Sequence, residues 1–249
     1  MTAILRVHHA LRAAGLPNTG PPERILNAMN EVWATGDYII RINPRPGARR
    51  LQDEARLLLY LPAEVKAPVP VAAGPASWGE WAVTVRIPGR ELSRVWAGLT
   101  ETARQRAVTE LGHALESIHG VTAPSQVSAG DPDRCPHPLP VSRLLGLLAD
   151  ASDIPGVERE VFTDAAEHLA RVAPFVDDDW STLVHGDLHL ENVLATDGGE
   201  ITGVLDFEWS RPGPPDLDLD VLLNSLTQPE LHHSTAAAEG LTRSDFDRF

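Results

Sequence analysis

The chain has 249 residues with 21 Lys or Arg against 35 Asp or Glu, so its formal net charge is −14. The acidity argues against a nucleic-acid partner, no apolar run approaches the roughly 20 residues of a membrane span, and one cysteine excludes a disulfide framework or a multi-cysteine zinc site. Because the N-terminal stretch lacks the long apolar segment of a signal peptide, we expect a cytoplasmic protein, with its oligomeric state unknown.

The charge is spread unevenly along the chain. Residues 1–90 hold 11 basic and 7 acidic residues, a net of +4, whereas residues 91–249 hold 10 basic and 28 acidic ones, a net of −18. A sign change between the halves suggests two parts with different partners. A GC-rich coding sequence can account for the ratio of 20 Arg to one Lys, but it does not explain this asymmetry.

The first part of the chain alternates helical and strand-like patterns. Apolar residues at helical spacing predict helices over 2–14 and 49–61. Strands are predicted over 24–33, over 38–42 after a Thr35-Gly36-Asp37 turn, and over 81–87, where Pro88-Gly89 stops the pattern.

The second part is mostly helical. The spacing predicts helices over 100–119, 140–150, 158–172 and 216–226, with a proline-rich loop over 122–140. Short strands are predicted over 182–184 and 201–207. Strands early and helices late indicate an α+β fold with a small sheet lobe and a larger helical lobe.

Two polar blocks, each flanked by short apolar runs, carry the chemistry. The first runs from His185-Gly-Asp187 to Asn192, and Asp206-Phe-Glu208 begins fourteen residues later. Two carboxylates and an amide are the groups that magnesium-assisted phosphoryl transfer requires. Asp187 would orient and deprotonate an acceptor hydroxyl, while Asn192 and Asp206 would hold Mg²⁺ against the phosphates.

These blocks resemble those of the aminoglycoside phosphotransferase and choline kinase family, which shares the protein-kinase-like fold. The resemblance implies two lobes: a nucleotide-binding lobe with a small antiparallel sheet over residues 1–86, and a helical catalytic and acceptor-binding lobe over 87–249. It also implies ATP (or GTP) and Mg²⁺ as cofactors, bound in the cleft between the lobes.

Weaker resemblances lie upstream of the two blocks. The segment Asn30–Trp33 is similar to the family's nucleotide-covering hairpin, and Arg41 lies on what looks like the next strand. Glu54 resembles the glutamate that pairs with the phosphate-binding cation. The segment containing Val85 and Ile87 looks like the hinge between the lobes, against which the base would lie.

One departure concerns the phosphate-binding cation. Many kinase-fold enzymes carry a lysine on that strand, but the only lysine here is Lys66, in a loop. Arg41 can take over the role because a guanidinium is always charged and can bind phosphate with two hydrogen bonds. The chain also has no G-x-G-x-x-G motif, so a catalytically dead kinase-like binding module stays open as an alternative.

Four further residues of the two blocks and their surroundings are candidates for supporting roles. Asp218 resembles the aspartate that braces the catalytic loop, and His185 is expected to orient that loop by hydrogen bonds. His189 could be a surface residue or a neighbour of the bound phosphates, and Glu208 could lie near the metal or the substrate. The alternation His185-x-Asp187-x-His189 also permits a zinc hydrolase, which would leave Asn192 and the second block unexplained.

We therefore expect an ATP- or GTP-dependent phosphotransferase that moves the γ-phosphate to a hydroxyl group of a small molecule. The −18 part should attract a cationic acceptor, which favours an aminoglycoside-like antibiotic. A metabolic kinase acting on a choline-, sugar- or amino-acid-type hydroxyl is the alternative within the same class.

Overall fold

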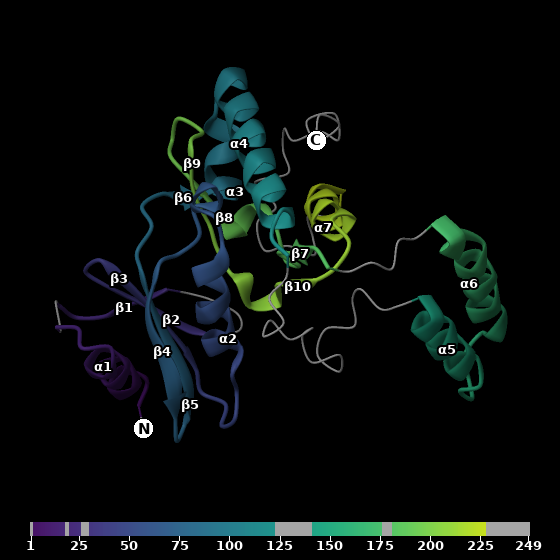
Figure 1. Cartoon of the computed structure of the whole chain (residues 1–249), viewed down its shortest axis with the longest axis horizontal. Helices are drawn as coiled ribbons and strands as arrows, with labels where there is room; N and C mark the ends of the chain where they lie inside the picture. The colour runs from purple at the N-terminus through teal and green to yellow at the C-terminus, as the bar shows by residue number, and fades with distance from the viewer. Residues whose placement is uncertain (1, 18–19, 26–29, 123–140, 176–180, 228–249) are drawn as a thin grey trace.

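The N-terminal lobe is built on one five-stranded antiparallel sheet with the order β1-β2-β3-β5-β4 (Figure 1). In the computed structural model, which describes residues 2–17, 20–25, 30–122, 141–175 and 181–227, the strands have these bounds: β1 Glu23–Ile25, β2 Glu31–Thr35, β3 Tyr38–Asn43, β4 Pro70–Ala76 and β5 Gly79–Val85. The strand predicted over 24–33 is wrong as one unit, because β1 folds back on β2 and pairs Ile25 with Val32.

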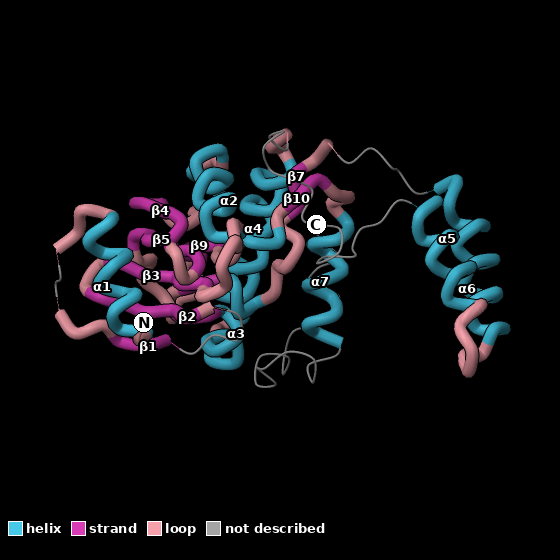
Figure 2. Tube along the Cα trace, turned by 90° about the horizontal axis from the view of Figure 1, so that it is seen from below, coloured by secondary structure: helices cyan, strands magenta, loops and turns pink. Residues whose placement is uncertain are grey.

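The two faces of the sheet have different neighbours. Successive strand residues point to opposite faces, so Ile40 and Ile42 of β3 share one face and Arg41 lies on the other. Helix α1 (Ala3–Ala13) packs against the first face through Val7 and Leu11. Helix α2 (Arg50–Leu57) lies on the opposite side of the sheet, toward the second lobe (Figure 2).

A buried carboxylate joins α2 to the sheet. Glu80 of β5 is fully buried and accepts hydrogen bonds from the Gln52 backbone N–H in the first turn of α2 and from Asn43 Nδ2 of β3. The carboxylate therefore satisfies a backbone donor that the helix itself leaves without a partner. This contact places the next turn of α2, which carries Glu54, over the face of the sheet that carries Arg41.

The C-terminal lobe is mainly helical. Its helices are α3 Leu92–Val95, α4 Glu101–His119, α5 Val141–Ser152, α6 Arg159–Val172 and α7 Asp216–Thr227. Its short strands are β6 Arg90–Glu91, β7 Leu183–Val184, β8 Val193–Ala195, β9 Ile201–Val204 and β10 Arg211–Pro212. Strands β6, β8 and β9 form one sheet, and β7 pairs with β10. The strand predicted over 201–207 ends at Val204, three residues early.

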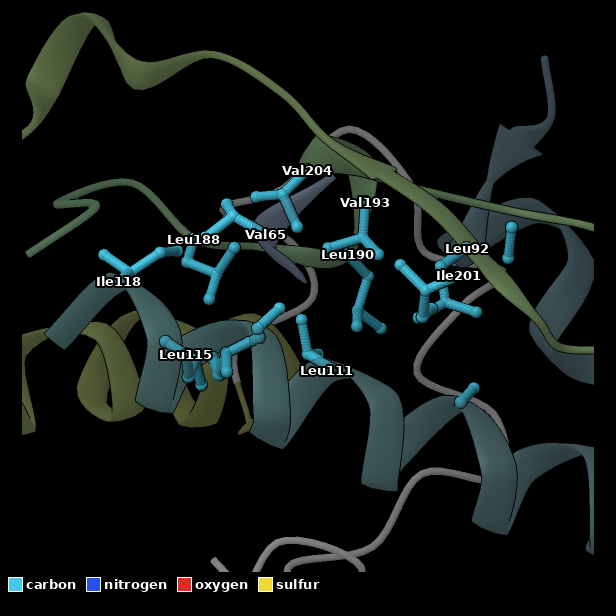
Figure 3. Packing of buried hydrophobic residues seen from close by; sticks show 14 of the residues in the cluster. Val65, Leu92, Leu111, Leu115, Ile118, Leu188, Leu190, Val193, Ile201 and Val204 are labelled. Atoms are coloured by element: carbon cyan, nitrogen blue, oxygen red, sulfur yellow. The ribbon is translucent and has the colours of Figure 1, made fainter. Parts of the chain in front are cut away.

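The core of this lobe lies between α4 and the short strands. Figure 3 shows Leu111, Leu115 and Ile118 of α4 directed toward the segment that carries Leu188 and Val193. All five side chains are buried, and burying one such aliphatic side chain contributes about 1.5–3 kcal/mol. The polar residues of the first block are thus mounted on a segment anchored by its own leucines and valines.

The segment after α2 belongs to this second core although strands β4 and β5 of the N-terminal sheet follow it in sequence. Val65 is fully buried in the cluster of the C-terminal lobe. Lys66 Nζ donates to the Ile201 carbonyl at 2.6 Å and lies 3.3 Å from Glu110 Oε2. The only lysine of the chain therefore joins β9 and α4, away from the strand position that carries Arg41.

Helices α5 and α6 pack on each other as a hairpin that stands apart from the rest of the chain in both views (Figures 1 and 2). Neither helix contains a buried residue. The predicted proline-rich loop falls largely on residues 123–140, outside the described residues. Over the described ranges, none of the helices combines the length and apolarity needed to cross a bilayer.

Candidate active site

A cleft of about 440 Å³ lies between the two lobes. The N-terminal lobe lines it with α2 and with the face of the sheet that carries Arg41, and the C-terminal lobe lines it with residues of the two polar blocks. The lining includes Arg41, Glu54, Val85, Ile87, Asn192 and Asp206, six residues that the sequence marked as candidates.

The β8–β9 hairpin brings the two polar blocks together. Val193 of β8 pairs with Val204 of β9, and the Leu205 N–H continues the pairing by donating to the Asn192 carbonyl at 2.7 Å. Asn192 therefore lies opposite Leu205, one residue from Asp206. The fourteen-residue spacing between the blocks corresponds to the length of this hairpin.

Asp206 turns the chain out of the strand. Its φ of 66° is in the left-handed region, which aspartate tolerates better than most residues because its short polar side chain can bond locally. The 3-10 helix Phe207–Trp209 follows, and the Phe207 N–H donates to Glu54 Oε1 of α2 at 2.9 Å. The same glutamate that contacts Arg41 thus also holds the backbone beside Asp206.

Asp187 lies in the loop before the 3-10 helix Leu190–Asn192. The Asp187 carbonyl accepts a hydrogen bond from Asn192 Nδ2 at 2.9 Å. Partial burial, together with the nearby charge of Asp206, raises the pKa of Asp187 to about 7, although Arg211 opposes this shift. A carboxylate with a pKa near the working pH is suited to accept a proton from a hydroxyl group.

Asp218 makes two hydrogen bonds to the backbone of this loop and a third to His119 at the end of α4. Its Oδ1 accepts from the Gly186 N–H at 2.7 Å, and its Oδ2 accepts from the His185 N–H and faces His119 Nε2, both at 2.9 Å. Burial alone would raise the pKa of Asp218, but the hydrogen bonds from His119 and the loop backbone outweigh it, so the pKa is lowered. Asp218 is fully buried and ionised, a structural support for the catalytic loop.

His185 lies in the core. Its ring packs against Phe207 with 4.6 Å between the centroids, and its Nε2 lies 2.8 Å from the Leu205 carbonyl. Burial lowers the pKa of His185, so the ring is neutral and donates from Nε2. His185 thus links the loop of Asp187 to the segment of Asp206.

Arg41 lies at the centre of a carboxylate cluster. Its Nη1 donates to both oxygens of Glu54, at 2.7 and 2.5 Å, and its Nη2 donates to Asp206 Oδ1 at 2.9 Å and to Glu208 Oε1. Asn30 Nδ2 donates to the same oxygen of Glu208. A guanidinium has enough donors in one plane to serve three carboxylates at once, which a lysine ammonium could not do in this geometry.

The ionisation of this cluster follows from burial and charge. Burial would lower the pKa of Arg41, but attraction from Glu54, Asp206 and Glu208 outweighs it, so the pKa is raised. Burial raises the pKa of Glu54 to about 7 and also raises that of Glu208, in each case against the pull of Arg41. The cluster has three carboxylates against Arg41 and, at 3.9 Å from Glu208, Arg50, so an acidic group is left over when all three are ionised, which favours binding of a further cation.

The segment between the lobes is anchored where it leaves β5. The Val85 N–H donates to the Val69 carbonyl at 2.9 Å and the Arg86 N–H to the Asp37 carbonyl at 2.7 Å. Val85 and Ile87 both line the cleft. Asn30 is buried through its contact with Glu208 and does not line the cleft.

Two arginines of the site were missed in the sequence. Arg211 of β10 is buried beside the catalytic loop, donates from Nη1 to the Trp209 carbonyl at 2.6 Å, and counteracts the rise in the pKa of Asp187. Arg50 lies over the Trp209 ring at 3.9 Å from its centroid, with its Nε 3.9 Å from Glu208 Oε2. No sequence signal distinguishes Arg50 from its neighbour Arg49, because only the fold selects which one reaches the cluster.

The donor set suits magnesium. Mg²⁺ is usually held by one or two protein oxygens together with substrate phosphates and water, so Asn192 and Asp206 are a sufficient protein contribution. Within the described ranges, no group of three or more His, Cys, Asp or Glu is placed to hold a metal ion by itself. The zinc interpretation also needs His185 as a ligand, but His185 is fully buried and bonded to Leu205.

A small antiparallel sheet lobe, a larger helical lobe and an oxygen-rich site between them define the protein-kinase-like fold. Solved structures of aminoglycoside phosphotransferases share it. The GDP complex of wild-type aminoglycoside 2'-phosphotransferase-IIIa is 19% identical and aligns over 99% of this chain and 85% of that chain, with a TM-score of 0.69.

Two further structures give similar values. The GDP and kanamycin complex of APH(2")-IIia is 18% identical over 98% of this chain and 86% of that chain, with a TM-score of 0.66. The ADP-bound APH(2'')-Ib is 17% identical over 91% of this chain and 76% of that chain, with a TM-score of 0.62. No curated protein sequence matches the chain.

Residues 22–248 match the family described as the phosphotransferase enzyme family. The chain belongs to this family and is a small-molecule kinase. The two-lobed fold class expected from the sequence is thereby confirmed.

Proposed function

We propose that the protein transfers the γ-phosphate of ATP or GTP to a hydroxyl group of a cationic, aminoglycoside-like acceptor. The observation that carries the proposal is the convergence of Asp187, Asn192 and Asp206, which the β8–β9 hairpin and the Asp218 brace hold beside the cleft that contains Arg41. The acceptor oxygen forms a bond to the γ-phosphorus while the bond from phosphorus to the β-γ bridging oxygen breaks.

Each residue has a physical task in this transfer. Asp187 orients the acceptor hydroxyl and takes its proton. Arg41, held by Glu54, binds the non-transferred phosphates. Asn192 and Asp206 would hold Mg²⁺, which neutralises phosphate charge when bound. The backbone at Val85 and Ile87 would contact the base.

The class of acceptor follows from charge. The C-terminal 159 residues, from 91 to 249, carry a net charge of −18, which raises the local concentration of cations. Solved relatives of the same fold are complexes with kanamycin and with gentamicin, both polyamine antibiotics.

The test is phosphate transfer from ATP and from GTP to a panel of cationic antibiotics, choline, neutral sugars and macrolides, with the product identified by its mass shift. We expect Asp187→Asn to lose at least about 100-fold in turnover, the typical contribution of a general base, while nucleotide affinity stays within a few-fold. Asp197→Asn is the matched control, because that carboxylate is 81% exposed and lies on the surface.

Unchanged turnover in Asp187→Asn would overturn the assignment of the base. Nucleotide binding without transfer to any acceptor would favour a binding module. Transfer only to neutral acceptors would refute the charge argument and leave a metabolic kinase.

A further inference from the structure

The orientation of the Asn192 amide is determined by its neighbours. Asn192 Nδ2 lies 2.9 Å from the Asp187 carbonyl oxygen and 3.1 Å from His189 Nε2. A carbonyl oxygen can only accept, so the amide nitrogen and not the amide oxygen must face Asp187. The second amide hydrogen then points at His189 Nε2, which has to accept it.

This arrangement decides which atom Asn192 offers to a cation. With both amide hydrogens engaged, Oδ1 is the remaining polar atom of the side chain. Magnesium takes oxygen ligands, and an amide nitrogen that carries two hydrogens cannot serve as one. A rotation of the amide by 180° would exchange the two atoms and lose the ligand at almost no steric cost.

His189 can accept only if its hydrogen is on Nδ1. That nitrogen lies 4.0 Å from Glu191 Oε2, beyond hydrogen-bond reach, so the tautomer follows from the Asn192 amide, whose second hydrogen Nε2 has to accept. The Nε2 side also faces Asp187 Oδ2 at 3.8 Å. The backbone at His189 is held in place, because its backbone N–H donates to the Asp187 carbonyl at 3.1 Å and the flanking Leu188 and Leu190 are buried.

We propose that His189 is a positioning residue that holds the Asn192 amide with its oxygen available to the divalent cation. The inference rests on the proposed function, because it assigns the cation to Asn192. It replaces the two roles that the sequence left open for His189, a surface residue or a direct phosphate neighbour.

Two variants separate these roles. In His189→Gln the side-chain amide can place an oxygen where Nε2 lies, whereas in His189→Asn the same amide is one methylene shorter and cannot reach. Mn²⁺ binding to the enzyme–ADP complex is measured by EPR, and the Mg²⁺ dependence of transfer is measured in parallel. We expect His189→Asn to weaken Mn²⁺ binding roughly tenfold or more, the usual effect of losing a group that orients a metal ligand.

A positioning role predicts that metal affinity changes while turnover at saturating Mg²⁺ changes little. Turnover of His189→Asn at saturating Mg²⁺ should stay within a few-fold of wild type, and His189→Gln should bind Mn²⁺ within about threefold of wild type. A second measurement needs no variant: the ¹⁵N chemical shifts of His189 should report a proton on Nδ1 and none on Nε2.

Three results would overturn the inference. One is equal Mn²⁺ affinity of wild type and His189→Asn, and another is a proton on Nε2. The third is a fall in turnover at saturating Mg²⁺ with unchanged metal affinity, which would place His189 at the phosphates or the acceptor. If wild type itself neither binds Mn²⁺ with ADP nor transfers phosphate, the proposed function fails and this inference fails with it.

Discussion

The carboxylate cluster around Arg41 makes a quantitative prediction about stability. Arg41→Met keeps the approximate length and the apolar stem of the side chain but removes its charge. It leaves Glu54, Asp206 and Glu208 without the cation that all three contact. The side chains of Arg41 and Glu54 are only 15% and 3% exposed, so water cannot replace these contacts.

The expected magnitude follows from burial. Removing one partner of a buried ion pair costs about 3–5 kcal/mol, because the other partner stays buried and uncompensated. Domains of this kind have a total stability of about 5–15 kcal/mol. With a shift of about 2–4 °C per kcal/mol at this chain length, the melting temperature should fall by roughly 6–20 °C.

Thermal unfolding followed by circular dichroism measures the loss directly. Arg41→Lys retains a positive charge but not the planar fork, so its loss should be smaller. Arg56→Met is the matched control, because Arg56 and its partner Asp53 are 58% and 44% exposed and such surface pairs contribute about 0–1 kcal/mol.

A double variant tests the cause. If the loss comes from uncompensated charge, Glu54→Gln in the Arg41→Met background should recover part of the stability, since the neutral amide removes one buried charge. A melting temperature of Arg41→Met equal to that of Arg56→Met would refute the reasoning, because the buried cluster would then be worth no more than an exposed pair.

Two further predictions concern the catalytic loop. Because burial lowers the pKa of His185, the folded chain binds fewer protons than the unfolded chain below about pH 6.5, so the unfolding free energy should fall as the pH drops through that value. Denaturant titrations at several pH values should show that the unfolding free energy depends less on pH in His185→Gln than in wild type; the glutamine keeps a donor for the Leu205 carbonyl. An equal pH dependence in the two proteins would contradict a buried neutral His185. Gly186 has a φ of 81°, and an added Cβ would lie 2.5 Å from the Trp209 carbonyl oxygen. The free energy of unfolding of Gly186→Ala should therefore fall by more than the about 1–2 kcal/mol that the backbone conformation alone costs, and transfer activity should be lost with it. Gly98→Ala is the control, because an added Cβ there meets no atom within 4 Å, so its melting temperature should stay near that of wild type. Equal melting temperatures of the two variants would contradict the close approach at Gly186.

Local pattern was enough to predict most elements of the fold. The helical spacing over 100–119 predicts α4, observed as Glu101–His119, and the helix predicted over 158–172 is α6, Arg159–Val172. The prediction over 24–33 failed because it treated the whole range as one strand, although asparagine, which stands at positions 27 and 30, is more frequent in turns than in strands. Only the pairing of Ile25 with Val32 shows that two strands are present.

The candidate residues of the site divide in the same way. Asp187, Asn192 and Asp206 could be selected from the sequence because their types and spacing suit phosphoryl transfer. The role of Arg50 could not, since it depends on Trp209 of a distant segment lying within about 4 Å, a distance set by packing and not by local propensity. The role of His189 could not either, because its contact with the Asn192 amide, three residues along the chain, depends on the conformation of the loop.

The sequence by itself thus determined the chemistry available to this protein: the carboxylates, the amide and an arginine in place of a lysine. The tertiary structure decided how these groups are used. The β8–β9 hairpin sets Asn192 beside Asp206, Asp218 supports the loop from a helix more than thirty residues away, and the sheet presents Arg41 to three carboxylates. The physical reason is that hydrogen bonds and ion pairs act over only a few ångströms, so groups far apart in sequence interact only after the chain has folded.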